Sequence, residues 1–301
     1  MAERLEYAAA WLALKSLGLL PRRLARAAGA WMVALAYCFR PPLRRTAVFN
    51  LRLAFPEWAD AERRRTIRRL VRHLGWMAGE FSQFPRYTRE NIEQVVMLDG
   101  FENFAAAERR GKGVLFLTGH MGAWELAPFA HALYGHPLHF LVRPIDNARV
   151  DGLVNRYRCL SGNRPVDKNQ SARAMLSILG TGGTVGILMD QNTTREEGVF
   201  VDLFGIPACT STGLARIALH TDAAVVPGYI CWDATLRKYR LRFEPAVELV
   251  RSGDREADIR ENTARFTRVI ESYARRYPDQ WLWVHRRWHT RPPGEKPLYP
   301  V

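Results

Sequence analysis

The chain has 301 residues, of which 48% are hydrophobic, and its formal net charge is +14. A chain of this length and hydrophobic content can bury a large core, which excludes an intrinsically disordered protein. Only five residues are lysine, so the excess charge is almost all arginine and indicates an anionic partner: nucleic acid, anionic lipid or an acidic protein.

Two apolar stretches, residues 7–20 and 27–39, open the chain. Each is shorter than the roughly 20 residues that span a bilayer, so we expect helices that lie in or dip into the membrane interface. A tilted span stays an alternative. No small-residue cleavage site follows a short apolar core, so a removed signal peptide is not expected. Residues 1–40 are therefore predicted to be a membrane-associated segment.

Arginines are concentrated close to these apolar stretches. Between residues 21 and 72 there are thirteen arginines and three acidic residues. Arginine beside apolar, tryptophan-bearing segments suits an anionic membrane surface better than a nucleic-acid groove.

The remaining chain, residues 41–301, is predicted to form one α/β domain. Residues 41–110 are expected to be helical throughout, because apolar residues after Asp60 recur at helical spacing. Short buried strands are expected at residues 114–118, 138–142, 185–189 and 223–229, and an alternating strand near a sheet edge at 239–243. Helices are expected at residues 124–133, 151–160, 171–179, 212–220 and 254–277. This alternation predicts a central mixed sheet with helices on both faces.

The strongest candidate for chemistry is His120, which follows an expected strand beside two glycines, with Glu125 five positions later. In one continuous helix these side chains would point roughly 140° apart, so they can meet only if His120 lies in the turn before the helix. A neutral imidazole can take the proton of an attacking alcohol, and a carboxylate on its other nitrogen fixes the tautomer. We therefore expect His120 as general base and Glu125 as its orienting partner. The structural alternative is a packed histidine with a surface glutamate.

Other catalytic patterns are missing from the sequence. The four cysteines match no disulfide framework and no CxxC metal site. His285 and His289 are four residues apart, but no acid or cysteine completes a ligand set, so neither a metal nor another cofactor is expected. There is no G-x-S-x-G elbow and no plausible catalytic cysteine.

Four ordered blocks carry a family resemblance. Gly119-His120 through Leu126 resembles the H-x4-D/E block of the lysophospholipid acyltransferase superfamily. The other three blocks are VRPIDN at residues 142–147, MDQN at 189–192 with GVFVDLFGIP at 198–207, and WVHRRWHTRP at 283–292. They are similar to the R-P-x-x-N, D-Q with F-F-G-x-P, and W-x-H-R-R-x-x-T-R-P segments of the bacterial lipid A biosynthesis (Kdo2-lipid A lauroyl/myristoyl) acyltransferases. The second glutamate of an E-G-T-R-like block is missing, which favours this branch over the glycerol-phosphate acyltransferases.

The resemblance implies a glycerolipid-acyltransferase-like fold and a set of substrate-binding residues. Arg143 and Arg158 would bind phosphate or polarise the acyl carbonyl, a task that guanidinium forks suit. Asp190 would order the site or accept from a donor, although it could simply cap the following loop. Asn147 and Gln191 belong to the same blocks and are expected to contact substrate.

The resemblance also implies the reaction. A fatty acyl chain would move from a thioester of acyl carrier protein or coenzyme A to a hydroxyl of a lipid A-type glycolipid. The expected location is the cytoplasmic face of a bacterial inner membrane. Donor and acceptor would react in a ternary complex, without an acyl-enzyme. An arginine-rich surface suits the acidic carrier and anionic lipid equally, and no nucleic acid is expected.

Two alternatives stay open from the sequence. The acceptor could be another membrane lipid, such as a phosphatidylinositol mannoside or a non-saccharide lipid. Alternatively, the chain could be a non-catalytic basic lipid-binding protein, which would have no use for His120 and Glu125.

Overall fold

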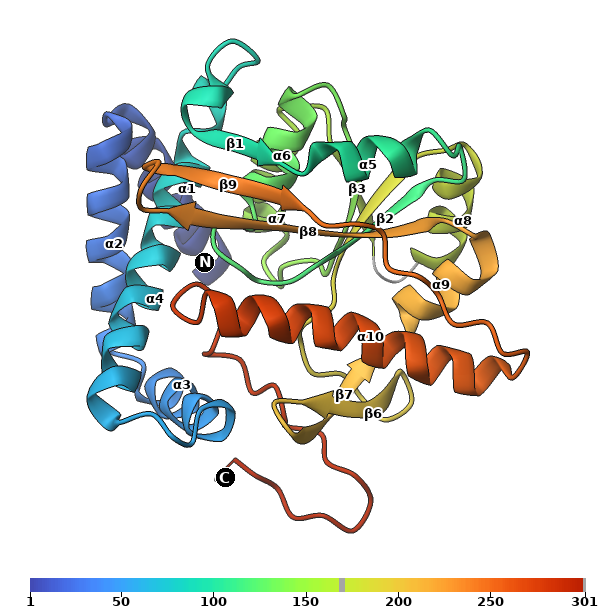
Figure 1. Cartoon of the computed structure of the whole chain (residues 1–301). Coiled ribbons are helices and arrows are strands. Elements are labelled where there is room, and N and C mark those ends of the chain that lie inside the picture. Colours follow the sequence, from blue (N-terminus) through green and yellow to red (C-terminus); the bar gives the residue numbers. More distant parts are fainter. Residues whose placement is uncertain (168–170, 300–301) are drawn as a thin grey trace.

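The computed structural model describes residues 1–167 and 171–299 and has an α/β fold with a mixed central sheet (Figure 1). Its helices are α1 (Ala2–Leu19), α2 (Arg22–Cys38), α3 (Pro41–Ala54), α4 (Asp60–Ser82), α5 (Phe101–Glu108), α6 (Leu126–Leu133), α7 (Ala148–Arg158), α8 (Ser171–Gly180), α9 (Gly213–Thr221) and α10 (Arg255–Arg276). Its strands are β1 (Val96–Asp99), β2 (Val114–Thr118), β3 (His139–Val142), β4 (Arg164–Asp167), β5 (Thr184–Leu188), β6 (Gly198–Leu203), β7 (Ile206–Ser211), β8 (Ala224–Asp233) and β9 (Lys238–Phe243). Short 3-10 turns occupy Phe84–Arg86 and Ile92–Gln94.

The described strands of the central sheet follow the order β1-β9-β8-β2-β5-β3-β4. The strands from β8 to β4 pair in parallel, whereas β9 is antiparallel to β8 and parallel to β1. Parallel strands end at the same edge of a sheet, so the loops after β2 and β5 emerge side by side. A separate hairpin is formed by β6 and β7.

The core lies on both faces of the sheet because side chains of β2 alternate between them. Leu115 and Leu117 pack in one cluster with residues of α8, α9 and α10. Val114 and Phe116 pack in a second cluster with residues of α5, α6 and α7. A strand covered on both faces is apolar throughout, which is why this segment reads as a continuous hydrophobic run.

Most of the predicted strands and helices after residue 110 are confirmed to within a few residues, but one expectation is wrong and three strands were not predicted. Residues 41–110 are not helical throughout, since β1 interrupts them; this four-residue strand is stabilised by pairing with the distant β9. The strand β9 lies next to the edge strand β1, so its expected place near the sheet edge is confirmed. Its alternation arises because Arg240 and Arg242 lie on one face, where they pair with Asp99 of β1. The strands β4, β6 and β7 were not expected at all.

The two N-terminal apolar stretches form α1 and α2, and α2 packs closely on α4. A Cβ atom on Gly75 would lie 2.3 Å from the Cα of Ala30, so the two helix backbones touch. Beside this contact, Arg22 donates to the buried Glu80 at 2.7 Å. None of the helices in the described ranges combines the length and apolarity that a membrane span requires. The division of the chain at residue 40 stays a prediction.

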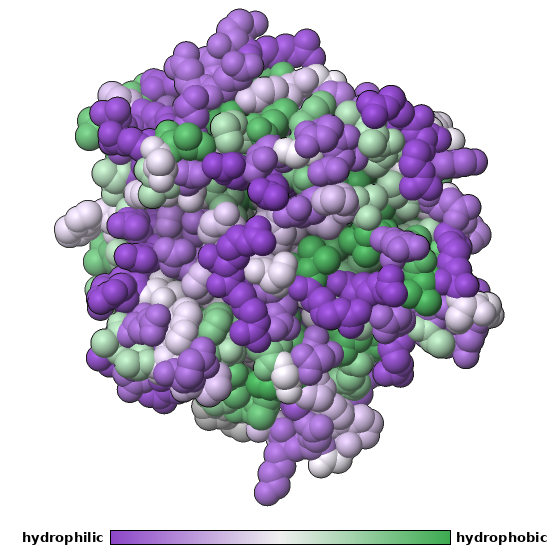
Figure 2. Space-filling model, viewed as in Figure 1, coloured by the Kyte–Doolittle hydropathy of each residue, from purple (hydrophilic) through white to green (hydrophobic). Residues whose placement is uncertain are grey.

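Hydrophobic side chains nevertheless reach the surface. Figure 2 shows that, on the face viewed in Figure 1, they form separate patches between hydrophilic side chains. On α1 and α2 the large exposed apolar residues are Leu5, Trp11, Leu12, Leu19, Leu24, Trp31, Met32 and Leu35.

Candidate active site

His120 and Asp190 are brought together by the pairing of β2 with β5. In the register of these parallel strands, Thr118 lies opposite Leu188. Two residues further along, His120 and Asp190 therefore emerge side by side at the carboxyl ends of their strands, where ligand sites of α/β sheets gather.

The two side chains form a direct, largely buried contact. Nδ1 of His120 lies 2.7 Å from Oδ1 of Asp190. The backbone N–H of His120 donates to Oδ2 at 2.8 Å, and the indole N–H of Trp281 donates to the same oxygen, also at 2.8 Å. A carboxylate with these donors stays ionised, and it favours the imidazole tautomer with hydrogen on Nδ1.

Glu125 does not make this contact, so the hydrogen-bond partner expected for His120 is corrected. Glu125 immediately precedes α6, and its carboxylate accepts from Nε and Nη2 of Arg158 at 2.8 and 2.5 Å. The physical reason is the turn between β2 and α6: it ends with Glu125, whose side chain meets Arg158 of α7. The catalytic roles of His120 and Glu125 stay predictions.

Two glycines allow this turn. Gly122 has a φ of +56°, and a Cβ there would lie 2.0 Å from the carbonyl oxygen of Ile230, so a side chain cannot be accommodated. At Gly119 a Cβ would lie 3.0 Å from the carboxyl carbon of Asp190. Trp124 then closes one side of the imidazole, with ring centroids 5.2 Å apart. The glycines noted in the sequence therefore let His120 approach Asp190.

The electrostatics of the pair follow from burial and opposite charge. Burial lowers the pKa of His120, but the Asp190 carboxylate and the more distant Glu125 outweigh it, so the net shift is upward from 6.5. Burial acts to raise the pKa of Asp190, but His120 and the N–H donors outweigh it and lower the pKa to about 2. Asp190 is therefore a fixed negative charge, able to stabilise an imidazolium.

The other imidazole nitrogen faces the accessible side. Nε2 of His120 lies 3.3 Å from the side-chain nitrogen of Gln191, a residue that is exposed. In the tautomer that Asp190 favours, Nε2 carries a lone pair and accepts this weak hydrogen bond. An incoming hydroxyl could replace the Gln191 amide without breaking a buried contact.

The C-terminal block holds the Asp190 loop in place. Leu282 N–H donates to the carbonyl of His120 at 3.1 Å, and His285 Nε2 accepts from the Asn192 N–H at 3.0 Å. The buried Arg287 donates to the carbonyl of Cys209 at 2.9 Å. His285 and Arg287 of this block therefore make hydrogen bonds within the protein that stabilise the fold around the site. Trp281, which lies two residues before this block, was not predicted as a site residue.

The other expected substrate-binding residues lie in different surroundings. Arg143 is exposed in the loop after β3. Asn147 caps α7 and donates to the carbonyl of Glu3 and to the Glu6 carboxylate of α1, at 2.9 and 2.8 Å. Arg158 is paired with Glu125 as described above. Their substrate-binding roles, like those of Asp190 and Gln191, stay predictions.

An apolar cavity of about 70 Å³ opens beside the turn that carries His120. It extends between β2, β5 and α6, and its lining is mainly aromatic and aliphatic: Phe116, Thr118, Trp124, Ala127, Pro128, His131, Leu138, Phe140, Gly186, Leu188, Gly228, Leu241 and Phe243. The titratable residue of its lining, His131, is buried, and burial lowers its pKa to about 3, so it is neutral at physiological pH. The cavity therefore suits a hydrocarbon.

Comparison with known proteins identifies the family of the chain. The sequence profile of the bacterial lipid A biosynthesis acyltransferases matches residues 2–290. A lipid A biosynthesis palmitoleoyltransferase of Escherichia coli strain K12 is 27% identical over 264 residues, which cover 86% of this chain and 84% of that protein. The lauroyltransferase of the same organism is 26% identical over 83% of this chain and 80% of its own length. A lipid A biosynthesis acyltransferase of Haemophilus influenzae is 25% identical over 84% of this chain and 77% of its own. The chain therefore belongs to the bacterial lipid A biosynthesis acyltransferase family and is an acyltransferase.

Proposed function

We propose that this protein transfers a fatty acyl chain from a thioester to a hydroxyl of a lipid A-type glycolipid, with His120 as general base. The observation that carries the proposal is the His120 imidazole, which is oriented by Asp190 at Nδ1 and accessible at Nε2, beside an apolar cavity. Glu125 then acts through its charge and through Arg158, and not as the hydrogen-bond partner of His120.

The proposed step needs no covalent enzyme intermediate. The acceptor hydroxyl attacks the thioester carbonyl while Nε2 of His120 takes its proton, and the Asp190 carboxylate stabilises the resulting imidazolium. Collapse of the tetrahedral intermediate breaks the carbon–sulfur bond. The thiolate leaves and receives the proton from His120, so the imidazole is restored and an ester is formed.

The apolar cavity is the proposed site of the acyl chain. Each buried CH₂ contributes about 0.8 kcal/mol, so a hydrocarbon chain is strongly favoured in a slot lined by Phe116, Phe140 and Phe243. At the described size the slot holds only part of a fatty acyl chain, so we expect its aromatic walls to move apart when the donor binds.

The membrane is the proposed location, at the cytoplasmic face of the inner membrane. A lipid acceptor is too apolar to leave a bilayer freely. The exposed apolar residues of α1 and α2 lie on the helices nearest to the many arginines of residues 21–72, a combination that suits an anionic interface. The donor is proposed to be an acyl carrier protein or coenzyme A thioester, since both present the same reactive group.

The test is a product assay with purified protein. Acyl carrier protein and coenzyme A thioesters are each offered with a lipid A-type glycolipid, a phosphatidylinositol mannoside and a diacylglycerol, and products are weighed by mass spectrometry. We expect acylation of the lipid A-type glycolipid, which His120→Ala abolishes. If only one of the other two lipids is acylated, that lipid replaces the glycolipid as the proposed acceptor. Binding of lipid without turnover by any pair would favour a lipid-binding protein.

A further inference from the structure

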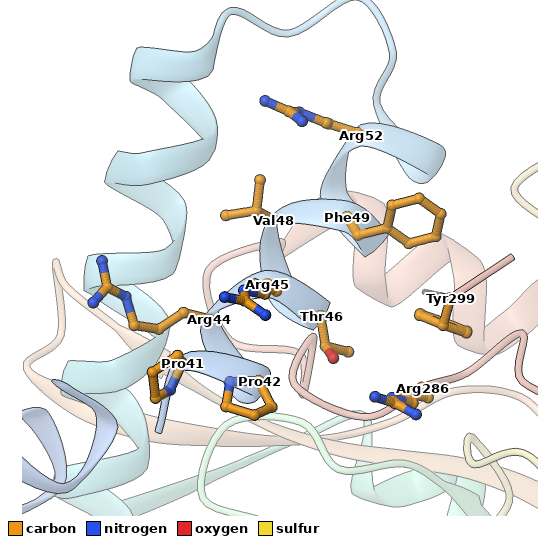
Figure 3. Close-up of a pocket in the computed structure, with 10 residues that line it drawn as sticks. All are labelled: Pro41, Pro42, Arg44, Arg45, Thr46, Val48, Phe49, Arg52, Arg286 and Tyr299. Atoms are coloured by element: carbon orange, nitrogen blue, oxygen red, sulfur yellow. The ribbon is translucent and has the colours of Figure 1, made fainter. Parts of the chain in front are cut away.

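A large basic groove lies between α3 and the C-terminal segment, by which we mean the described chain that follows α10. Its volume is about 750 Å³. We call it the α3 groove and define it by its lining: Pro41, Pro42, Arg44, Arg45, Thr46, Val48, Phe49, Arg52, Arg286 and Tyr299. Figure 3 shows Arg44 and Arg45 near the start of α3, with Arg286 and Tyr299 on the C-terminal segment beside them.

Three of the four arginines in the α3 groove have no acidic partner within the described residues. The lining of the groove contains four arginines and no acid. Arg52 pairs loosely with Asp60 at 3.4 Å. Arg44, Arg45 and Arg286 are exposed, and within the described ranges no acid forms an ion pair with them. Exposed guanidinium groups without acidic partners suit phosphoryl groups, to which they donate paired hydrogen bonds.

The walls of the groove are fixed relative to each other. The side chain of Asn50, on α3, donates to the carbonyls of Trp283 and His285, each at 2.7 Å. Tyr299 donates to the Asn50 side-chain oxygen, also at 2.7 Å. Because α3 is thereby tied to the segment that carries Arg286, the backbone positions of the arginines are fixed around one space before a ligand arrives.

The groove leads towards the reactive histidine. A second cavity, of about 410 Å³, shares Pro42, Thr46 and Arg286 with it and is also lined by Asn192 and His285. Asn192 directly follows Gln191, the residue in contact with Nε2 of His120. A molecule with its hydroxyl at His120 can therefore extend into the α3 groove.

Exposed apolar side chains run from the end of α2 into the start of α3, next in sequence to two arginines of the groove. Leu35, Phe39 and Leu43 are 52%, 77% and 40% exposed, and the chain continues directly into Arg44 and Arg45. Arginines that border an exposed apolar surface lie at the level of lipid headgroups when that surface enters a membrane. This placement favours a phosphate carried by a lipid over one carried by a soluble donor.

We infer that the α3 groove binds the phosphoryl groups of the glycolipid acceptor at the membrane surface, through Arg44, Arg45 and Arg286. The inference rests on the proposed function, and it adds that the protein recognises the phosphorylated headgroup of the acceptor in the α3 groove. Phosphate held here directs the sugar hydroxyls past Asn192 towards His120.

The test compares R44Q/R45Q with R255Q/R260Q, which removes the same charge from exposed arginines of α10. Michaelis constants are measured in neutral-detergent micelles for a phosphorylated lipid A-type glycolipid, for the same lipid after phosphatase treatment, and for the thioester donor. In R44Q/R45Q we expect the KM for the phosphorylated acceptor to rise about tenfold or more, as when a charge-assisted hydrogen bond is lost. The KM for the donor and the rate with dephosphorylated acceptor should match those of the control.

Two results would overturn the inference. The first is equal acceptor KM values in R44Q/R45Q and the control. The second is a rise in the donor KM alone, which would assign the groove to the donor. A binding assay separates this inference from the proposed function. The full-length protein is mixed with neutral vesicles that contain the phosphorylated glycolipid, and binding is measured without turnover. Loss of that binding in R44Q/R45Q but not in the control supports the groove even if no lipid is acylated.

Discussion

Asp190→Asn is the substitution that tests the active-site geometry most directly. The carboxylate accepts from Nδ1 of His120, from the His120 N–H and from the indole of Trp281. An asparagine keeps the shape but has a single acceptor atom for these donors. If its amide nitrogen faces His120, it donates to Nδ1, so the ring proton moves to Nε2. The imidazole then cannot take a proton from the acceptor hydroxyl.

The expected loss of activity is large. A histidine base held in the wrong tautomer loses about 10³–10⁴-fold in turnover. The variant should also be less stable. Asp190 is fully buried and its pKa is lowered from 3.8 to about 2, which corresponds to roughly 2–3 kcal/mol of the free energy of unfolding at neutral pH. Because the folded-state pKa is lowered, this contribution is present above pH 4 and is lost as the pH falls towards 2.

Two measurements check these values. Single-turnover kinetics at saturating donor and acceptor give the chemical step, and urea unfolding gives stability. The pH profile tests the direction of the pH dependence, because only the neutral imidazole acts as a base and the pKa of His120 is raised above 6.5. Wild-type turnover should therefore rise with pH through a midpoint above 6.5. Without the Asp190 charge, the midpoint of any residual activity should move to lower pH.

The matched control is Glu125→Gln, which weakens the pair with Arg158 but leaves the Nδ1 contact intact. It should lose less activity than Asp190→Asn. It should also keep the His120 tautomer with hydrogen on Nδ1, and nitrogen-15 NMR of the imidazole distinguishes the two tautomers. The reasoning is refuted if Asp190→Asn, still folded, stays within tenfold of wild-type turnover while Glu125→Gln loses 10³-fold.

Three further predictions concern the base, the surface and the cavity. His120→Ala should lower turnover by about 10² or more. It should also lower the free energy of unfolding, because the buried Asp190 carboxylate loses its main partner. A folded variant with near wild-type turnover would remove His120 from the mechanism. Trp31→Ser with Leu35→Ser removes apolar area from an exposed face of α2 and should reduce sedimentation with anionic vesicles; Leu160→Ser with Leu236→Ser, at other exposed sites, should not. Deleting residues 1–40 is a poorer test, because α2 packs on α4 and deletion would expose the buried Glu80. Gly186→Val should fit beside Leu138, since its Cβ lies 3.7 Å from that side chain, and should narrow the cavity; activity should fall more with long acyl donors than with short ones, and an unchanged chain-length profile would place the acyl chain elsewhere.

The sequence by itself determined the general fold and the central histidine. Short apolar runs at 114–118 and 185–189 could be recognised because strands buried on both faces are hydrophobic throughout. His120 stood out because it follows one of these runs beside glycines, and the four ordered blocks identified the family, which the comparison confirmed. The strand β1 was missed because its four residues carry little pattern and are held by a partner more than 130 residues away.

Only the tertiary structure decided which carboxylate contacts His120. Glu125 is five residues away in sequence and Asp190 is seventy, so reasoning along the chain favoured Glu125. The parallel register of β2 with β5 brings Asp190 beside the imidazole, while the turn carries Glu125 towards Arg158. The α3 groove likewise depends on contacts between α3 and a segment more than 230 residues later. Sequence spacing predicts contacts within a helix or a turn, whereas contacts across a sheet follow from strand order and register, which the spacing of residues along the chain does not specify.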